Sequence, residues 1–251
     1  PLFRSSAASD VYKRQPGGLL IYGIPNFKLE KFVVERRTKL LKDSGIKFVQ
    51  NFEVGKNKSL YELKEKHDAI LISTGVYKAR EIDIPGHNLK NIFPAMEFLT
   101  ASNRKGLGDK VKLFDDGTLN AQGKDVVVIG GGDTGADCLG TSIRQGAKKI
   151  TQIEIMPEPP EGRAADNPWP EWPMILRTSS AHEEGGNREY SILTKEFKGT
   201  EKLEKMICEK VEWKKDSSGK YTMEKIENSN FEIKSELVLL AMGFVHPLQE
   251  G

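Results

Sequence analysis

The fold is decided by the stretch DVVVIGGGDTGADCLGTSIRQ, residues 125–145, in which an apolar strand leads into a glycine-rich loop and then a helix. Gly130, Gly132 and Gly135 form the pattern G-x-G-x-x-G between these two elements. A further strand is expected at residues 149–156. Three glycines alone would indicate only a tight loop, but their place between a strand and a helix makes the pattern specific. The stretch therefore predicts a βαβ unit of a Rossmann-like α/β domain.

Each glycine of the pattern has its own physical role. The first lets the chain turn tightly, the second lets a pyrophosphate approach the backbone, and the third lets the helix pack closely on the strand. The helix N-terminus adds unpaired N–H groups and partial positive charge. A dinucleotide is therefore expected to bind at the loop and the start of the helix, on Gly130, Gly131, Gly132, Asp133, Thr134 and Gly135.

Glu154 stands at the end of the next strand, 24 positions after Gly130, close to the spacing of about 20 at which an acid meets the adenosine ribose. A carboxylate there accepts a hydrogen bond from the 2′-hydroxyl of NADH and repels the 2′-phosphate of NADPH. The following residues, 155–157, contain neither Arg nor Lys, so the pattern favours NADH. Two alternatives stay open: Arg163 could reach a 2′-phosphate from a loop, or Glu154 is a solvated strand end.

Composition excludes several classes of protein. The 251 residues include 38 Lys and Arg against 36 Asp and Glu, and a net charge of +2 gives no field for binding nucleic acid. With 37% hydrophobic and 29% charged residues, the chain is expected to form one large or two medium globular domains. The longest apolar stretch, Leu237–Val245, is far shorter than the roughly 18 residues that span a bilayer.

Cysteine usage points to a reducing compartment. Cys138 and Cys208 are the only two cysteines and stand seventy positions apart, so the chain builds neither a disulfide framework nor a multi-thiolate metal site. The cytoplasm is the expected location. A thioredoxin-type reductase is disfavoured, because it needs a redox-active cysteine pair. Cys138, on the helix after the glycine loop, is interpreted as a packed core thiol.

The remaining chain alternates helices and strands. Residues 1–15 start without Met and show no periodicity, so they are interpreted as a non-native or unstructured leader. Upstream of the glycine loop, the expected elements are a helix at 28–44 stopped by Gly45, a strand at 46–54, a helix at 59–66 capped by Ser59, a buried strand at 68–74 and a helix at 94–102. Downstream, an antiparallel meander is expected at 205–213, 221–226 and 231–233, with a turn at 216–219, and then an apolar strand at 237–240.

Several stretches taken together resemble the small (beta) subunit of glutamate synthase and the matching C-terminal portion of NADH-dependent glutamate synthase. The resemblance runs from about Pro16 to Pro247. It is carried by GGLLIYGIPNFKLEKFVVERR (17–37), STG (73–75), VVVIGGGDTGADC (126–138), EIMPEPP (154–160), NPWPEWP (167–173), HEE (182–184) and LVLLAMGF (237–244).

The resemblance implies a flavoprotein with two dinucleotide-binding domains. The expected fold class is α/β, with an NAD(P) domain inserted in a partial FAD domain, together with the antiparallel meander. It places the partial FAD domain at 16–90, the NAD(P) domain at 91–235 and a return strand of the FAD domain at 236–251. In this family FAD is expected to contact Gly17, Gly18, Ser73, Thr74, Gly75 and Gly243.

The implied activity is that of an electron-entry module. NAD(P)H gives a hydride to FAD, and electrons pass through 4Fe-4S clusters, expected only on an upstream region, to a large (alpha) subunit that makes two glutamates from glutamine and 2-oxoglutarate. The cofactors do this chemistry, so no catalytic side chain and no metal site is assigned to the chain. The family's FAD glycine motif is expected upstream of Gly17, so this chain is expected to bind FAD poorly.

Other assignments stay open at this stage. The module could serve an NAD(P)H:ferredoxin-type or a pyrimidine-reducing flavoprotein, or the chain could be a non-catalytic nucleotide-binding fragment. The stretch His182–Glu184 has no chemical role assigned, and a structural hydrogen bond is its preferred interpretation.

Overall fold

The computed structural model describes residues 16–216 and 221–247 and divides the chain into two compact units. The first unit contains the described residues up to Arg80, together with 99–111 and those from Gly243 onward, and the second contains 81–98 and 112–242. The expected leader at 1–15 and most of the expected turn at 216–219 lie outside the described residues. Within the described ranges, every helix is too short or too polar to cross a membrane.

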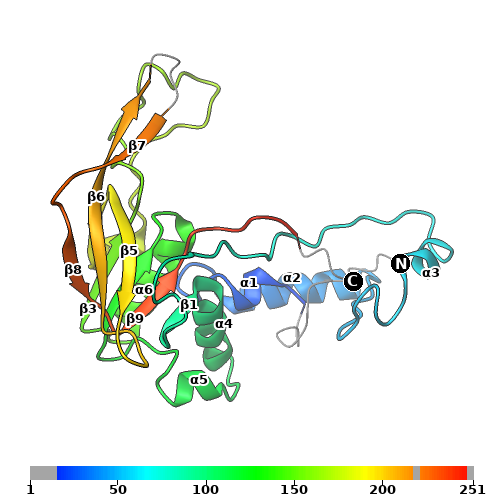
Figure 1. Cartoon of the computed structure of the whole chain (residues 1–251). Coiled ribbons are helices and arrows are strands. Elements are labelled where there is room, and N and C mark those ends of the chain that lie inside the picture. The colour runs from blue at the N-terminus through cyan, green and yellow to red at the C-terminus, as the bar shows by residue number, and fades with distance from the viewer. Residues whose placement is uncertain (1–15, 217–220, 248–251) are drawn as a thin grey trace. The chain divides into compact units, whose positions relative to one another are not determined.

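A five-stranded parallel sheet forms the centre of the second unit (Figure 1). Its order is β1 (Ile92–Pro94), β9 (Leu237–Leu240), β2 (Asp125–Ile129), β3 (Lys149–Ile153) and β4 (Asn187–Glu189). Helix α6 (Asp133–Arg144) leads from β2 to β3 and packs on both strands. The predicted βαβ unit is therefore confirmed.

An antiparallel sheet makes the second layer. Its longest strand, β6 (Lys205–Lys215), pairs with β5 (Ile192–Lys198) along one edge. β7 (Tyr221–Lys225) and β8 (Phe231–Lys234) share the other edge of β6, at opposite ends of it. The three strands predicted at 205–233 are thus confirmed, but the last returns to the first part of β6 and does not continue a simple meander.

The core of the second unit lies between the two sheets. Val127, Ile153 and Val238 of the parallel sheet pack against Phe197 and Met206 of the antiparallel one. Side chains alternate along a strand, so the neighbours of Val127 in β2 point to the opposite face, and these too are buried. Burial on both faces explains why the strands are continuous apolar runs.

The first unit holds three short helical segments, α1 (Leu19–Tyr22), α2 (Lys31–Asp43) and α3 (Leu60–Lys64), and residues 99–111, which include the second half of α4 (Ala95–Gly106). Its small core consists of Ile21, Tyr22 and Val34 with Leu29 and Leu107 against them. The Asn103 side chain of α4 donates to the Tyr22 carbonyl at 3.0 Å and fixes the end of α1. Two further short helices, α5 (Lys112–Asp115) and α7 (Ser180–Glu183), belong to the second unit.

Local sequence signals in the first unit are accurate. Helix α2 occupies most of the predicted range 28–44, and Gly45 follows it with a φ of 88°, a conformation that favours glycine. Ser59 caps α3 by accepting from the Glu62 backbone N–H, while the Glu62 carboxylate accepts from the Ser59 N–H. A capping box lies within four consecutive residues, which is why the helix start at Ser59 was predictable from the sequence.

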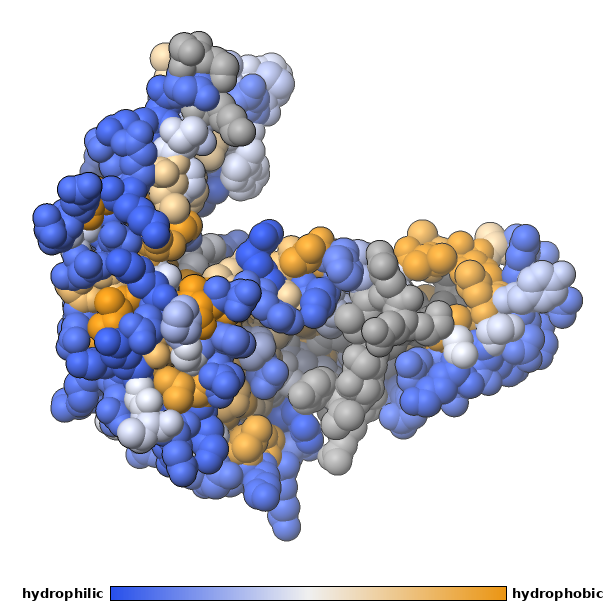
Figure 2. Space-filling model, in the orientation of Figure 1, coloured by the Kyte–Doolittle hydropathy of each residue, from blue (hydrophilic) through white to orange (hydrophobic). Residues whose placement is uncertain are grey.

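The strands predicted at 46–54 and 68–74 are wrong. Both segments lack strand structure, and Leu71 and Ile72 are 83% and 68% exposed instead of buried. A strand persists only where its backbone groups pair with a neighbour, and among the described residues no strand adjoins either segment. Figure 2 shows hydrophobic side chains gathered on the surface of this part of the chain.

The assignment of residues 236–251 to the flavin domain is also wrong for its strand. β9 lies between β1 and β2. Its Val238 is opposite Ile92 of β1 on one side and Val127 of β2 on the other. Its side chains complete the core of the second unit. Only the part from Gly243 onward belongs to the first unit, where the Arg80 N–H donates to the Gly243 carbonyl at 3.0 Å.

Candidate dinucleotide-binding site

The glycine loop begins with a turn that only glycine can make. Gly130 has a φ of 124°, and its N–H donates to the Ile153 carbonyl of β3 at 2.8 Å. A Cβ at this position would lie 2.2 Å from the Ala241 carbonyl oxygen. The positive φ and the close approach of a second backbone together explain the first glycine of the pattern.

The second glycine leaves an open anion-binding surface. Gly132 is the N-cap residue of α6, has an ordinary φ of −80°, and provides no side-chain cap for the N–H groups of the first turn. A Cβ built on it would meet nothing within 4 Å. The missing side chain is therefore not required by packing, and the uncapped helix start suits a pyrophosphate. Asp133 and Thr134 form the first turn beside it.

The loop follows β2, at the point in the sheet where the order of the strands reverses. From β2 the chain passes through α6 to β3 on one side, whereas β9 adjoins β2 on the other. The Ala241 N–H, just after β9, donates to the Ile129 carbonyl at 2.7 Å. Ligands of open α/β sheets bind in the crevice at the carboxyl ends of strands where the order reverses. Ala241 and the glycine loop lie against each other at this edge of the sheet, at the carboxyl ends of β9 and β2.

Glu154 is held against the loop. Its Oε2 accepts the Gly131 N–H at 2.5 Å, and its Oε1 accepts the Met156 N–H at 3.2 Å. A Cβ on Gly131 would come within 2.8 Å of Oε2, which explains why glycine stands between the first two glycines of the motif. Glu154 is thus a bound neighbour of the loop and not a solvated strand end. A carboxylate has about four acceptor sites, so it still has capacity for a ribose hydroxyl.

The arginine considered as an alternative reader of a 2′-phosphate is engaged elsewhere. The Arg163 Nη1 atom donates to the Asn167 and Glu171 carbonyls at 2.8 and 3.0 Å, so it closes its own loop. Arg188 of β4 was not considered from the sequence. Its guanidinium lies 5.5 Å from the Tyr190 ring centre. Burial raises the pKa of Tyr190 while the Arg188 charge opposes that rise and Glu154 adds to it.

Sequence reasoning missed a polar side chain of β3 that contacts the loop. Gln152 is 2% exposed, and its Nε2 donates to the Gly130 carbonyl at 2.8 Å. His182 of α7 in turn contacts the Gln152 Oε1 at 2.9 Å. The sequence of the strand, KITQI, gave no clear signal, because Gln152 is one of three polar residues in it.

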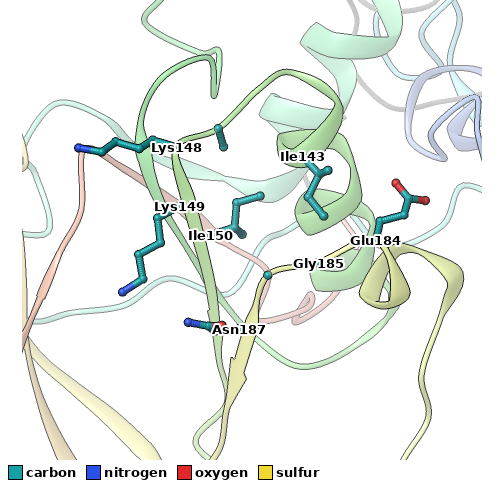
Figure 3. Close-up of a pocket in the computed structure, with 9 residues that line it drawn as sticks. Ile143, Lys148, Lys149, Ile150, Glu184, Gly185 and Asn187 are labelled. Carbon is teal, nitrogen blue, oxygen red and sulfur yellow. The ribbon is translucent and has the colours of Figure 1, made fainter.

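The pocket drawn in Figure 3 is a different feature. It has a volume of about 280 Å³ and lies between the end of α6 and the beginnings of β3 and β4, lined among others by Ile143, Lys149 and Asn187. The pocket is at the opposite end of α6 from the glycine loop, so it is separate from the candidate dinucleotide site.

The residues expected to contact FAD fall in two places of the first unit. Gly17 and Gly18 precede α1, and a Cβ on Gly17 would lie 2.7 Å from the Ile21 side chain, so close packing already requires this glycine. Ser73, Thr74 and Gly75 precede residues 78–80, which run antiparallel to the residues after Gly243. The described contacts do not bring Gly17 to this second group.

Both cysteines are buried and unpaired, and so the interpretation of Cys138 as a core thiol is confirmed. Burial raises the pKa of Cys138 well above its usual value and raises the pKa of Cys208 to about 12. Neither forms a thiolate at neutral pH. Among the described residues no group of three or more metal-ligating side chains occurs.

The fold and the glycine loop together are typical of an α/β domain of the class that binds dinucleotides at a topological switch point. Residues 10–245 match the family model described as pyridine nucleotide-disulphide oxidoreductase, and the chain belongs to this family. Membership supports a pyridine nucleotide and FAD as its cofactors. The fold is similar to that of Mycobacterium tuberculosis FprA solved in complex with NADPH, with a TM-score of 0.67 at 19% identity over 94% of this chain and 63% of that one.

Curated relatives extend this similarity. The chain is 47% identical to "Glutamate synthase [NADH]" of Schizosaccharomyces pombe over 96% of this chain and 12% of that protein. It is 45% identical to "Glutamate synthase [NADPH] small chain" of Mycobacterium tuberculosis H37Rv and 44% identical to that of Azospirillum brasilense, over 51% and 47% of those proteins. These alignments cover 100% and 94% of this chain. The chain thus spans about half the length of the small chains that it matches.

Proposed function

We propose that this chain is the nucleotide-binding part of a glutamate synthase small subunit and admits electrons as hydride from NADH. The observation that carries the proposal is the glycine loop, with Gly132 open to a ligand at an uncapped helix start and Glu154 held at its side. The names of the curated relatives support the same activity.

The positions of Gly132 and Glu154 determine the orientation of the bound dinucleotide. Its pyrophosphate binds at Gly132, and Glu154 of the β3 side accepts the adenosine ribose. The nicotinamide half then lies on the other side of β2, along Ala241. The hydride chemistry belongs to the cofactors, so this part of the chain orients the nicotinamide and needs no acid or base of its own.

NADH is the proposed donor, although relatives named for NADH and for NADPH are equally similar. Glu154 carries a negative charge beside the ribose position, which would repel a 2′-phosphate. Arg163, the basic residue that would oppose this preference, is bound within its own loop.

The residues of the first unit are compatible with FAD but do not surround it. Gly75 and Gly243 have φ values of 79° and 80°, and a Cβ on Gly243 would meet nothing within 4 Å, so a ligand could approach the backbone there. The apolar residues 70–72 beside Gly75 stay exposed. When bound, FAD would supply the acceptor for the hydride and separate its two electrons.

Within the whole protein we assign the onward path by the same resemblance. Electrons would pass through 4Fe-4S clusters on a segment upstream of this sequence to a large subunit that makes glutamate from glutamine and 2-oxoglutarate. The proposed location is the cytoplasm, since both cysteines are free thiols. The small net charge and the helices described here give no support for a nucleic-acid or membrane partner.

Two measurements test the proposal in order. Titration of the chain with NADH and with NADPH, followed by the fluorescence of the bound nicotinamide, should give saturable binding with NADH favoured. The full-length gene product, supplied with FAD, should then reduce ferricyanide with NADH. Absence of nucleotide binding would refute the site, and binding without ferricyanide reduction would favour the non-catalytic binding module.

A further inference from the structure

The peptide group between Gly130 and Gly131 forms hydrogen bonds with two side chains, Gln152 of β3 and Glu154 just after β3. Its carbonyl, which belongs to Gly130, accepts from the Gln152 Nε2 at 2.8 Å. Its N–H, which belongs to Gly131, donates to the Glu154 Oε2 at 2.5 Å. Gln152 in β3 and Glu154 just after its end are two positions apart, and both side chains reach the same peptide group. One peptide plane is therefore fixed by an amide donor and a carboxylate acceptor.

The fixation has a physical purpose because two adjacent glycines have little rotational restraint. A Gly-Gly peptide can rotate about its flanking bonds at low cost, which would exchange the directions of its carbonyl and its N–H. Such a rotation would put a carbonyl oxygen where an N–H now points and would alter the entry to the pyrophosphate position at Gly132. Both hydrogen bonds to β3 oppose this rotation.

The orientation of the Gln152 amide is in turn set by His182. The Ser179 N–H donates to the His182 Nδ1 at 3.1 Å, so this nitrogen is the acceptor and the proton of the neutral ring resides on Nε2. The His182 Nε2–H then donates to the Gln152 Oε1 at 2.9 Å. This leaves the Gln152 Nε2 facing the Gly130 carbonyl. Each of the three hydrogen bonds from the Ser179 backbone to the Gly130 carbonyl thus has one donor and one acceptor.

The third glycine of the motif makes room for this contact. A Cβ on Gly135 would lie 2.4 Å from the Gln152 Nε2 and 2.2 Å from the Gly130 carbonyl oxygen. The two atoms joined by the hydrogen bond thus occupy the space that a side chain would need. Gly135 serves the Gln152–Gly130 bond as well as helix packing.

We infer that His182 and Gln152 are positioning residues that hold the Gly130–Gly131 peptide in the orientation in which the loop binds the dinucleotide. The inference rests on the proposed nucleotide site and deepens it. It also fits the structural hydrogen bond preferred from the sequence for the stretch His182–Glu184, which His182 makes with Gln152. Neither residue touches the reacting atoms, so their effect is on affinity and not on the chemical step.

The test combines nucleotide binding with a direct probe of the peptide. NADH titration of the chain should show a roughly five- to twentyfold loss for Gln152→Leu and for His182→Phe, which removes the donor but keeps a ring. His182→Gln restores an N–H donor and should recover most of the affinity. Glu183→Gln, an exposed neighbour on α7, is the control and should bind NADH as the unmodified chain does.

Coupling and amide exchange separate positioning from general stability. If His182 acts through Gln152, adding His182→Phe to Gln152→Leu should cause no further loss of affinity. Exchange of the Gly131 amide proton, followed by NMR, should accelerate in both single variants while amides within α6 keep their protection. Gln152→Glu, which keeps the shape but removes the donor to Gly130, replaces Gln152→Leu if that variant does not fold.

The outcomes are distinct. Additive losses of affinity, or unchanged affinity together with unchanged Gly131 exchange, would overturn the inference while leaving the nucleotide site intact. If the unmodified chain binds neither NADH nor NADPH, the proposed function fails. The positioning role of His182 and Gln152 is then still tested by the exchange of the Gly131 amide. Faster exchange in both variants supports this role, and unchanged exchange overturns it.

Discussion

Replacing Gly132 by alanine should abolish most nucleotide binding while leaving the fold intact. The structure provides this separation because a Cβ at Gly132 meets no atom within 4 Å and the residue has an ordinary φ of −80°. The cost to folding is confined to a poorer N-cap, about 1 kcal/mol or less. In the complex, however, the added methyl group would occupy the surface on which the pyrophosphate meets the helix N-terminus.

The expected loss of affinity follows from the hydrogen bonds involved. A bond between a backbone N–H and a charged phosphate is worth about 1.5–3 kcal/mol, and displacement of the pyrophosphate by the methyl group should remove at least one. Since 1.4 kcal/mol is a factor of ten in affinity, the dissociation constant for NADH should rise at least roughly tenfold and up to about a hundredfold.

The assay compares NADH titration with thermal unfolding for the same sample. Gly106→Ala is the matched control, because a Cβ at Gly106, at the end of α4, also meets nothing within 4 Å. That variant should bind NADH normally. If Gly132→Ala binds NADH within twofold of the unmodified chain while remaining folded, the pyrophosphate does not lie at this helix start and the reasoning is refuted.

Four further predictions concern specificity, the thiols and the flavin. Glu154→Arg should shift the ratio of affinities toward NADPH, yet weaken binding of both nucleotides because the Gly131 N–H loses its acceptor. Parallel titrations with NADH and NADPH check this. An unchanged ratio would count against the assignment of Glu154 to the adenosine ribose. Cys138 and Cys208 should resist a maleimide at pH 8 until the protein is unfolded, since burial raises both pKa values; rapid labelling of the folded chain would disprove it. The Cys208 pKa is about 12 in the folded chain against 9.0 when exposed, so the unfolded state loses its proton first. The contribution of Cys208 to stability is therefore full below pH 9 and should fall by about 1.4 kcal/mol per pH unit between pH 9 and 12, and Cys138, whose pKa burial also raises, acts in the same direction. Denaturant titrations at pH 8 and 10 would show the loss. The 251-residue chain should bind FAD weakly, because the apolar segment around Leu71 is exposed and the described contacts do not bring Gly17 to Gly75; a purified sample with stoichiometric yellow flavin would contradict this.

The elements that the sequence predicted correctly share one property: the residues that specify them are close together in the chain. The Ser59 cap of α3 and the strand, loop and helix around Gly130 each depend on neighbours within a few positions. Glu154 was likewise found by its spacing from the first glycine, and the structure places it against Gly131.

The errors have the opposite origin. An apolar run such as residues 68–74 has the composition of a buried strand, but composition does not provide the neighbouring strand that would bury it. The position of β9 was misjudged for a related reason. Its sequence shows that it is buried on both faces but not beside which strand, and parallel partners come from distant parts of the chain.

The sequence by itself thus determined the class of this protein, because a glycine loop between strand and helix is a local arrangement that backbone sterics and helix electrostatics suffice to define. Only the tertiary structure decided how the site is completed. Gln152 and His182 are thirty positions apart, and Ala241 reaches Gly130 from the far end of the chain. These contacts depend on the order of the strands, which brings β9 and α7 to the loop, and strand order is a property of the packed sheet and not of any one segment.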